Sequence, residues 1–232
     1  MQNMRKPKNT QRGTVNRRFE RMKKTNSIEF DRHLFRRVFH TFAASFLIYY
    51  SLPNELWINT LKFYIPIVIV IFALIIEYLR IKGWIKASHF FGLRTYEEKR
   101  PAGYLYFGVA TLILLLFFPQ QIAIPCILCA CFSDPIIGEI RHHLGIKEAY
   151  VIGFIICMFF FGLTWFRADI WILVLVSILG GSGALVGEVK KFWFIDDDFM
   201  IQILPAILIL ILWQGLQVTG IDILPAKIIL PA

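Results

Sequence analysis

The chain has 232 residues, of which 57% are hydrophobic and only 18% are charged, and its formal net charge is +9. Soluble domains are nearer half apolar and a quarter charged, so this composition argues against a soluble globular protein. Uncharged runs at 63–76, 104–118 and 203–213 reach, with their flanks, the ~20 residues that a helix needs to cross ~30 Å of hydrocarbon. They lack the alternation of half-buried strands, which argues against a β-rich core.

Residues 1–30 are basic and polar, and we predict that they form a disordered cytoplasmic tail. The positive charge of this segment suits an anionic inner leaflet, at ~1 kcal/mol per basic residue near the surface. Nucleic-acid binding is the rival interpretation, but neither interleaved aromatic residues nor a recognisable folded module supports it. The expected organisation is this tail, a transmembrane domain at 31–218 and a short apolar C-terminal tail at 219–232.

The apolar segments predict an all-α fold: a polytopic bundle of about seven transmembrane helices. The predicted spans are His40 to Leu52, Leu61 to Arg80, Gly103 to Pro119, Gln121 to Ile140, Ala149 to Phe166, Ile170 to Gly187 and Met200 to Leu216. Twelve Lys and Arg residues precede the first span and six lie in the second connection, whereas the first and third connections have none. Since positive charge stays cytoplasmic in short loops, we predict a multi-pass protein of the cell membrane or endoplasmic reticulum with a cytoplasmic N-terminus.

Four cysteines fall inside apolar segments: Cys126, Cys129 and Cys131 in one, and Cys157 in another. On a continuous helix Cys126 and Cys129 share a face, but Cys131 points elsewhere. The apolar neighbours leave few groups to orient metal ligands. Small, polarizable residues that line helix contacts are therefore the favoured interpretation, ahead of a metal cluster.

Charged groups in or beside membrane spans are costly, so they usually face a cavity and mark function. His40 follows Arg36 and Arg37 at the entry to the first span. Anchoring accounts for the two arginines, whereas His40 adds a titratable or metal-binding group that anchoring does not require.

A second charged cluster follows the second predicted span. Glu77 precedes Arg80 by three residues, so the two side chains share a helix face and can pair. Arg suits phosphate binding because it offers planar, bidentate donors, so the next loop is a candidate phosphate-binding surface. Its candidate residues are Arg94, Glu97, Lys99 and Arg100.

Two further clusters are acidic. Asp134 lies some thirteen residues, or ~20 Å, into the fourth span and precedes Pro135, which disrupts the backbone hydrogen-bond ladder. Its carboxylate is therefore a candidate metal or ligand group.

Glu188 and then Asp196, Asp197 and Asp198 lie between the last two spans. An N-cap explains one Asp, but three in a row repel one another unless a cation neutralises them, and Mg²⁺ with a polyphosphate is the natural candidate. A capped, solvated turn is the alternative.

In these clusters, from about Arg36 to Pro205, the sequence resembles the CTP-dependent membrane lipid kinases, namely dolichol kinase, CTP-using diacylglycerol kinase and phytol kinase. More distantly it is similar to phosphatidate cytidylyltransferase. The resemblance rests on the order of weak motifs relative to the spans. These motifs are Arg36-Arg37-Val38-Phe39-His40, Glu77 with Arg80, Arg94 with Glu97 and Lys99, Ser133-Asp134 with Gly145, and Glu188 followed by Asp196 to Asp198.

The resemblance implies phosphoryl transfer from CTP to a lipid alcohol at the cytoplasmic face, with Mg²⁺. Asp134 and Asp196 to Asp198 would hold the metal, and Glu188 or His40 would act as base. The implied substrate-binding residues are Arg36, Arg37, Arg80, Arg94, Glu97, Lys99, Arg100, Arg141 and Lys147. The chain departs from the family in having Arg141 where a Gly is usual, Asp198 where an Asn is usual, and no K-[ST]-x-E-G-S stretch before the fifth span. The alternatives are a diverged, non-catalytic lipid-binding or scaffold protein and a cytidylyltransferase-like enzyme.

Overall fold

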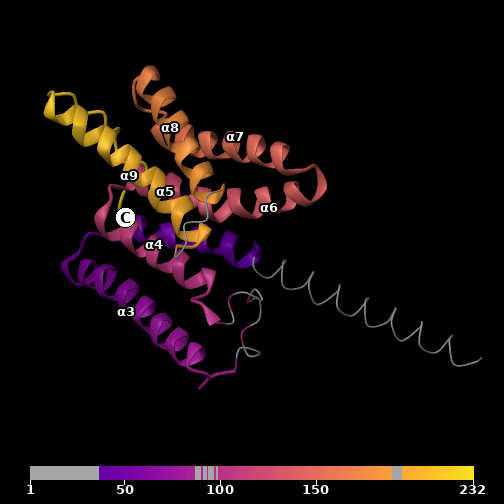
Figure 1. Cartoon of the computed structure of the whole chain (residues 1–232). Coiled ribbons are helices and arrows are strands. Elements are labelled where there is room, and N and C mark those ends of the chain that lie inside the picture. The colour runs from indigo at the N-terminus through magenta and orange to yellow at the C-terminus, as the bar shows by residue number, and fades with distance from the viewer. Residues whose placement is uncertain (1–36, 87–89, 91–92, 94–96, 98, 190–194) are drawn as a thin grey trace, which may run out of the picture.

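The computed structural model describes residues 37–86, 90, 93, 97, 99–189 and 195–232, and across these residues it contains helices and no strand. The predicted all-α fold is therefore confirmed (Figure 1). The basic tail at 1–30 lies outside the described residues. The elements are η1 (Ala43–Leu47), α2 (Ile48–Ser51), α3 (Leu56–Ile81), α4 (Gly103–Phe117), α5 (Gln120–Leu128), η4 (Cys129–Ser133), α6 (Asp134–His143), α7 (Ile146–Trp165), α8 (Ile170–Val189) and α9 (Asp197–Val218).

Five helices of the described chain are long and apolar enough to cross a membrane: α3, the continuous α5–η4–α6 helix, α7, α8 and α9. They correspond to five of the seven predicted spans. The other two are shorter. The apolar α4 has 15 residues, and the first segment is divided into helical residues 37–42, the 3₁₀ helix η1 and the four-residue α2. The count of seven spans and the cytoplasmic N-terminus stay predictions.

The helix that carries Asp134 is widened immediately before this residue. Cys129–Ser133 form a π-helix, η4, between α5 and α6. Pro135 explains the change, because it has no N–H to offer the carbonyl four residues earlier, and the chain relaxes into a wider turn. The predicted disturbance of the backbone at Pro135 thus takes the form of a π-bulge within a continuous helix.

Glycines bring α8 against its two neighbours. A methyl group at Gly187 would lie 2.5 Å from the carbonyl oxygen of Met200 in α9, and one at Gly183 would lie 2.9 Å from the Cα atom of Pro205. On the side of α7, Gly180 accommodates the ring of Phe161. In lipid, helices associate through close van der Waals contact, because burial of apolar surface gives no driving force there. The small residues of α8 allow this close approach.

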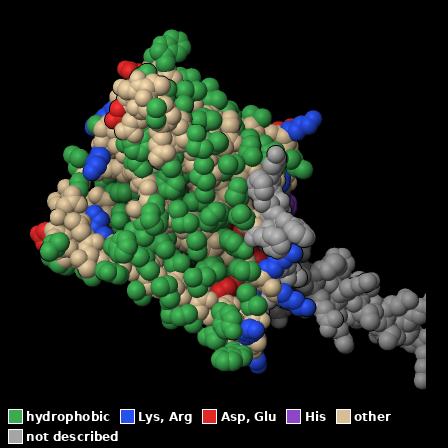
Figure 2. All heavy atoms as spheres, turned by 60° about the vertical axis from the view of Figure 1, so that its left-hand side comes forward, with side chains coloured by type: hydrophobic (Ala, Val, Ile, Leu, Met, Phe, Trp, Pro, Cys, Tyr) green, Lys and Arg blue, Asp and Glu red, His purple; other side chains and the backbone are tan. Residues whose placement is uncertain are grey.

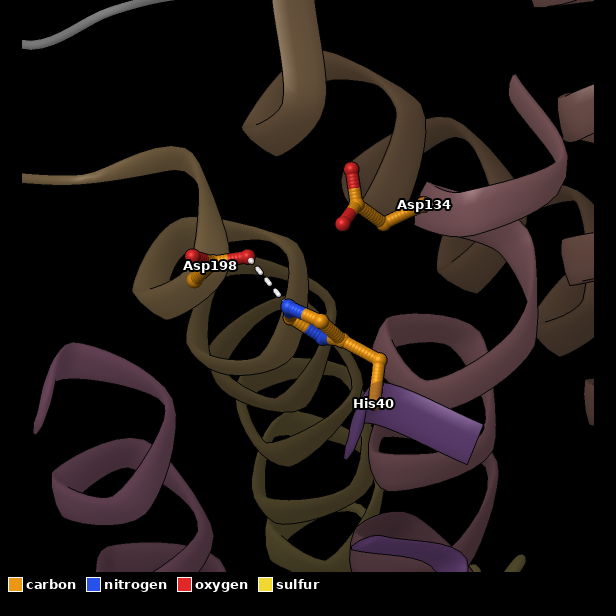
Figure 3. A group of neighbouring side chains, drawn as sticks. All are labelled: His40, Asp134 and Asp198. Atoms are coloured by element: carbon orange, nitrogen blue, oxygen red, sulfur yellow. Dashed lines mark ion pairs between the residues drawn. The ribbon is translucent and has the colours of Figure 1, made fainter. Parts of the chain in front are cut away.

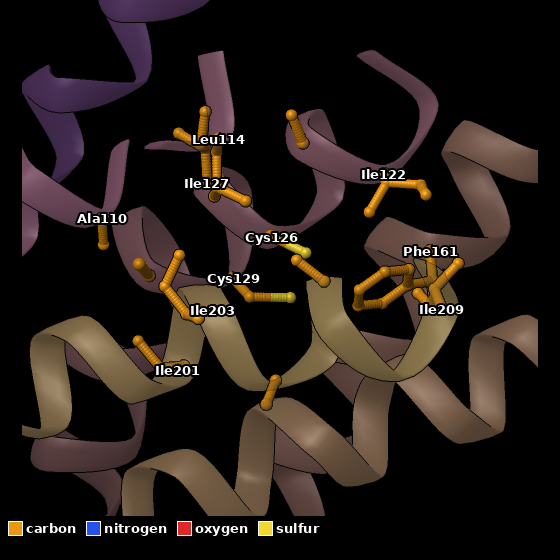
Figure 4. Close-up of a cluster of buried hydrophobic side chains, with 14 of the residues drawn as sticks. Ala110, Leu114, Ile122, Cys126, Ile127, Cys129, Phe161, Ile201, Ile203 and Ile209 are labelled. Carbon is orange, nitrogen blue, oxygen red and sulfur yellow. The ribbon is translucent and has the colours of Figure 1, made fainter. Parts of the chain in front are cut away.

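The core lies where α4, α5 and α9 meet α7 and α8 (Figure 4). Ile122, Phe161 and Ile209 are among its fully buried side chains, and all four cysteines are buried. Cys157 Sγ donates a hydrogen bond to Ser133 Oγ at 3.2 Å. The cysteines thus line helix contacts, as the favoured interpretation of the sequence expects.

Gln202 of α9 is a fully buried polar residue. Its Oε1 atom accepts a hydrogen bond from Thr111 Oγ1 at 3.0 Å, and its Nε2 atom donates to the carbonyl of Phe107 at 3.4 Å and to that of Asp198 at 3.0 Å. Because unpaired polar groups are costly in an apolar interior, this amide fixes the register of α9 against α4.

The segment at 219–232, predicted as an apolar tail, folds back on the bundle. Gln120 exchanges two hydrogen bonds of 3.1 Å with the backbone of Ile229, and Gln121 Nε2 donates to the carbonyl of Pro225 at 2.7 Å. The backbone N–H of Ala232 donates to the carbonyl of Ser51 at 3.0 Å. The segment therefore covers the end of the bundle at which α5 begins and α9 ends.

The exterior is apolar over a broad area. Figure 2 shows a face of hydrophobic side chains with the charged groups along its margins. The α3 helix contributes most to this exposure, and Phe63, Val68 and Phe72 are among its exposed side chains. Apolar surface of this extent, on helices of spanning length, indicates a membrane protein.

Candidate functional site

Three side chains from distant parts of the sequence meet at one end of the bundle. His40 comes from the first segment, Asp134 from the start of α6 just after the π-bulge, and Asp198 from the first turn of α9 (Figure 3). One ligand atom from each lies within 4.8 Å of those of the other two. His40 is 4% exposed and Asp198 2%, whereas Asp134 is partly buried. We call these three residues the inner cluster.

One ionic contact and one aromatic contact define the position of His40. Its Nε2 atom lies 3.6 Å from Asp198 Oδ1, and its ring packs edge-on against Phe107 of α4 with centroids 5.2 Å apart. The imidazole therefore has an apolar wall on one side and carboxylates on the other.

The acidic turn before α9 forms a second group that shares Asp198. Asp196, Asp197 and Asp198 also offer three ligand oxygens within 4.8 Å of one another. Asp196 is the N-cap, and its Oδ1 atom accepts a hydrogen bond from the N–H of Asp198 at 3.2 Å. Burial, followed by the contacts with Asp197 and Asp198, raises the pKa of Asp196 to about 9. A cap thus explains Asp196, while the repulsion in this turn favours a bound cation.

Glu188, at the end of α8, extends the acidic region. Its side chain is 5% exposed, and its Oε1 atom accepts a hydrogen bond from Arg141 Nη2 at 2.9 Å. The Arg141 guanidinium in turn lies over the ring of Tyr150, 5.2 Å from its centroid. The Glu188 carboxylate also interacts electrostatically with those of Asp134 and Asp197. The structure therefore brings together Asp134, Glu188 and the Asp196 to Asp198 turn, which the sequence places on three different elements.

Gly103, at the start of α4, allows Asp198 to approach. A methyl group at Gly103 would clash with Asp198 Oδ2 and would lie 3.5 Å from Glu97 Oε1. The N–H of Gly103 donates to Glu97 Oε1 at 3.3 Å, and Glu97 is buried. The N-terminus of α4, where the helix dipole favours negative charge, thus faces two carboxylates.

The predicted pairing of Glu77 with Arg80 is confirmed. Arg80 Nε and Nη2 donate to Glu77 at 2.9 and 2.5 Å. Glu77 also accepts from the N–H of Ala102 and from Tyr104 Oη, both at 2.6 Å, while Arg80 Nη2 donates to the carbonyl of Arg100 at 2.6 Å. This buried network holds the segment before α4 against the end of α3, so its first role is structural.

The predicted phosphate-binding cations differ in their surroundings. Arg37 pairs with Glu139, which also contacts His143 Nε2 at 2.8 Å. The side chains of Lys99, Arg100 and Lys147 are exposed. Arg36 and Arg94 lie outside the described residues.

Sequence reasoning missed two residues that position this site, Gly103 and Gln202. The sequence does contain a signal for Gln202, because it is one of two amides, with Gln214, in an apolar predicted span and lies one helical turn after Asp198. Gly103 follows the Arg94, Glu97 and Lys99 motif by four residues, but its role depends on a contact with α9 that no local pattern reveals.

Comparisons of the chain with protein-family models, curated proteins and solved structures find no match. The fold and the site define a class on their own: an all-helical protein of membrane type with an acidic, histidine-containing cluster at one end of its bundle. The resemblance to CTP-dependent lipid kinases stays a prediction.

Proposed function

We propose that the chain is an integral membrane kinase that transfers a phosphoryl group from CTP to a lipid alcohol, such as a polyprenol or diacylglycerol, at the cytoplasmic face. One observation carries the proposal: carboxylates from α6, α8 and α9 converge with His40 at one end of an apolar bundle. A lipid hydroxyl at the membrane boundary and a soluble polyphosphate can both reach such a position. Phosphoryl transfer needs mainly positioning and charge compensation, which this arrangement can supply.

In this proposal the lipid hydroxyl oxygen attacks the γ-phosphorus of CTP. The bond from that phosphorus to the β,γ-bridging oxygen breaks, CDP leaves with the electron pair, and the hydroxyl proton passes to Glu188 or His40. Asp134 and the Asp196 to Asp198 turn would hold Mg²⁺, which neutralises charge on the phosphates. The carboxylate-only ligand set of the acidic turn fits this hard cation.

Exposed cations are the best candidates to clamp the phosphates, because they are available to a soluble ligand. Lys99, Arg100 and Lys147 are exposed. Arg80 is held inside the Glu77 network, and Arg141 is engaged with Glu188. Arg141 can therefore orient Glu188 as well as contact a phosphate, whereas Arg80 acts through the position of the loop.

The test is transfer of labelled γ-phosphate from CTP to a panel of lipid alcohols by the purified protein in liposomes. We expect labelled lipid phosphate, and a loss of about 100-fold in Asp134→Asn, because a carboxylate that holds the metal is lost. Asp169→Asn is the control, because Asp169 is exposed in the loop after α7 and far along the chain from the site. The proposal fails if no nucleoside triphosphate supports transfer, or if Asp134→Asn retains full activity. Release of pyrophosphate with a cytidylylated lipid would indicate the cytidylyltransferase-like alternative.

A second candidate is a diverged, non-catalytic homologue that acts as a lipid-binding or scaffold protein. The carboxylate partners of Arg37, Arg80 and Arg141 favour it, because a cation engaged in an ion pair is a weaker phosphate clamp. Calorimetry separates the two candidates, since only the kinase binds CTP with Mg²⁺.

A further inference from the structure

The inner cluster combines an imidazole with two carboxylates, and this is a different ligand set from the acidic turn. His40, Asp134 and Asp198 each offer one atom to a common space, and their side chains converge on it from three separate elements (Figure 3). Mg²⁺ is bound by oxygen ligands and does not need a nitrogen donor. A nitrogen ligand instead suits a divalent transition metal.

The spacing of His40 and Asp198 fits ligation better than a hydrogen bond. Their atoms Nε2 and Oδ1 are 3.6 Å apart, beyond hydrogen-bond length. Two ligand atoms that each lie ~2.1 Å from one ion are ~3.0 Å apart at an angle of 90° and ~3.6 Å apart at 120°. The remaining separations, up to 4.8 Å, need only small side-chain adjustments to close on the same ion.

An independent observation at Glu188 also points to a cation. Its Oε2 atom is buried and has no hydrogen-bond partner within the described part of the chain, although the side chain is only 5% exposed. This carboxylate interacts electrostatically with Asp134 of the inner cluster and with Asp197 of the acidic turn. A buried carboxylate oxygen without a donor, next to two further carboxylates, is costly unless a positive charge compensates it.

We propose that His40 Nε2, together with the carboxylates of Asp134 and Asp198, binds a divalent transition metal of the Mn²⁺ type. The imidazole coordinates in its neutral form, and Phe107 holds the ring edge-on in the required orientation. Glu188 compensates the ion from outside the ligand set or through a bound water. Binding at this site does not require kinase activity, although Asp134 and Asp198 are also ligands of the proposed Mg²⁺ ion. Coordination occupies the lone pair of His40 Nε2, so for the proposed kinase it leaves Glu188 as the base.

Electron paramagnetic resonance of Mn²⁺ bound to the full chain in nanodiscs tests the proposal without any nucleotide. We expect a bound Mn²⁺ ion whose electron spin-echo modulation shows coupling to one ¹⁴N nucleus. His40→Gln should abolish this coupling and weaken Mn²⁺ binding by about 10- to 100-fold. His142→Gln, an exposed histidine of α6, is the control and should leave both properties unchanged.

A second measurement avoids substitution altogether, so a failure of His40→Gln to fold does not block the test. Labelling all five histidines with ¹⁵N should replace the ¹⁴N modulation of wild-type protein with that of ¹⁵N. The proposal is overturned if Mn²⁺ does not bind, or if bound Mn²⁺ shows no histidine coupling. It is equally overturned if the coupling persists in folded His40→Gln protein. Lipid kinase assays of the same preparations report on the proposed function separately.

Discussion

Substitution of Gly187 by Ala tests the closeness of α8 and α9, on which the site depends. The added methyl group would lie 2.5 Å from the carbonyl oxygen of Met200 and 2.8 Å from the backbone nitrogen of Ile201. Ordinary contact begins at 3.4 Å, so the carbonyl has to retreat by 0.9 Å, the difference between 3.4 and 2.5 Å. Because both neighbours are backbone atoms inside a helix, no change of rotamer relieves the clash, and the helices must separate.

Overpacking of this kind costs about 1–3 kcal/mol, whereas Gly to Ala in an unhindered helix interior gains about 1 kcal/mol. We therefore expect Gly187→Ala to lower the free energy of unfolding by up to about 2 kcal/mol, measured by titration of mild-detergent micelles with sodium dodecyl sulfate. Gly108→Ala and Gly215→Ala are the controls, because a methyl group at either position meets nothing within 4 Å. They should match or exceed the stability of wild type.

The same displacement should weaken Mn²⁺ binding, because Asp198 and Glu188 lie on the two helices that move apart. Gly187→Ala protein that is as stable as Gly108→Ala protein would refute the close contact. Reduced stability with unchanged Mn²⁺ affinity would show that the contact does not position the site.

Three further substitutions probe polar groups. Glu77→Gln breaks the buried pair with Arg80 and should cost about 3 kcal/mol of unfolding free energy in the same titration. Thr111→Val removes the donor to Gln202 Oε1 and should cost about 1–2 kcal/mol. Asp196→Asn keeps the N-cap but cannot ionise. Since the pKa of Asp196 is raised from 3.8 to about 9 in the folded protein, its ionisation destabilises the fold as the pH rises. In chelator, Asp196→Asn should become progressively more stable than wild type between these two pH values.

Controls for these substitutions come from exposed positions. Glu139→Gln breaks the partly exposed pair with Arg37 and should leave the free energy of unfolding nearly unchanged. If Glu77→Gln lowered the free energy of unfolding no more than Glu139→Gln does, the buried network would have no structural role. Thr60→Val removes a hydroxyl whose hydrogen bond lies within its own helix, and a comparable effect in Thr111→Val would argue against the Gln202 contact. A stability difference between wild type and Asp196→Asn that does not change with pH would contradict the raised pKa.

Local patterns in the sequence predicted the features that depend on local rules. Hydropathy located the five long helices to within a few residues, because membrane spans are defined by composition and length. The exception is the start of α3, which lies five residues before the predicted one. The pairing of Glu77 with Arg80 followed from their spacing of three residues. The acidic residues could be assigned to one end of the bundle because the spans alternate in direction.

The neighbours of each helix could not be predicted in the same way. Lipid and protein interior are both apolar, so α7, α8 and α9 show no polar face that would reveal which side is buried. The contact of Gly103 with Asp198 and the bonds from Glu77 to Ala102 and Tyr104 depend on that choice. The π-bulge escaped prediction for another reason, since Pro135 indicates a disturbance but not its form.

The π-bulge of η4 also determines how this chain can change in length. Its wider turn holds one residue more than an α-helix would accommodate. Each residue of the wider turn rotates the chain less than an α-helical residue does, so the bulge absorbs the rotation of the extra residue. Deletion of one residue between Cys129 and Ser133 would therefore restore a regular helix and leave Asp134 on the side on which His40 and Asp198 lie. A regular helix of the same length would instead turn Asp134 away from them by about 100° around the helix axis. Related sequences that retain the site should consequently carry either the bulge or one residue fewer in this stretch.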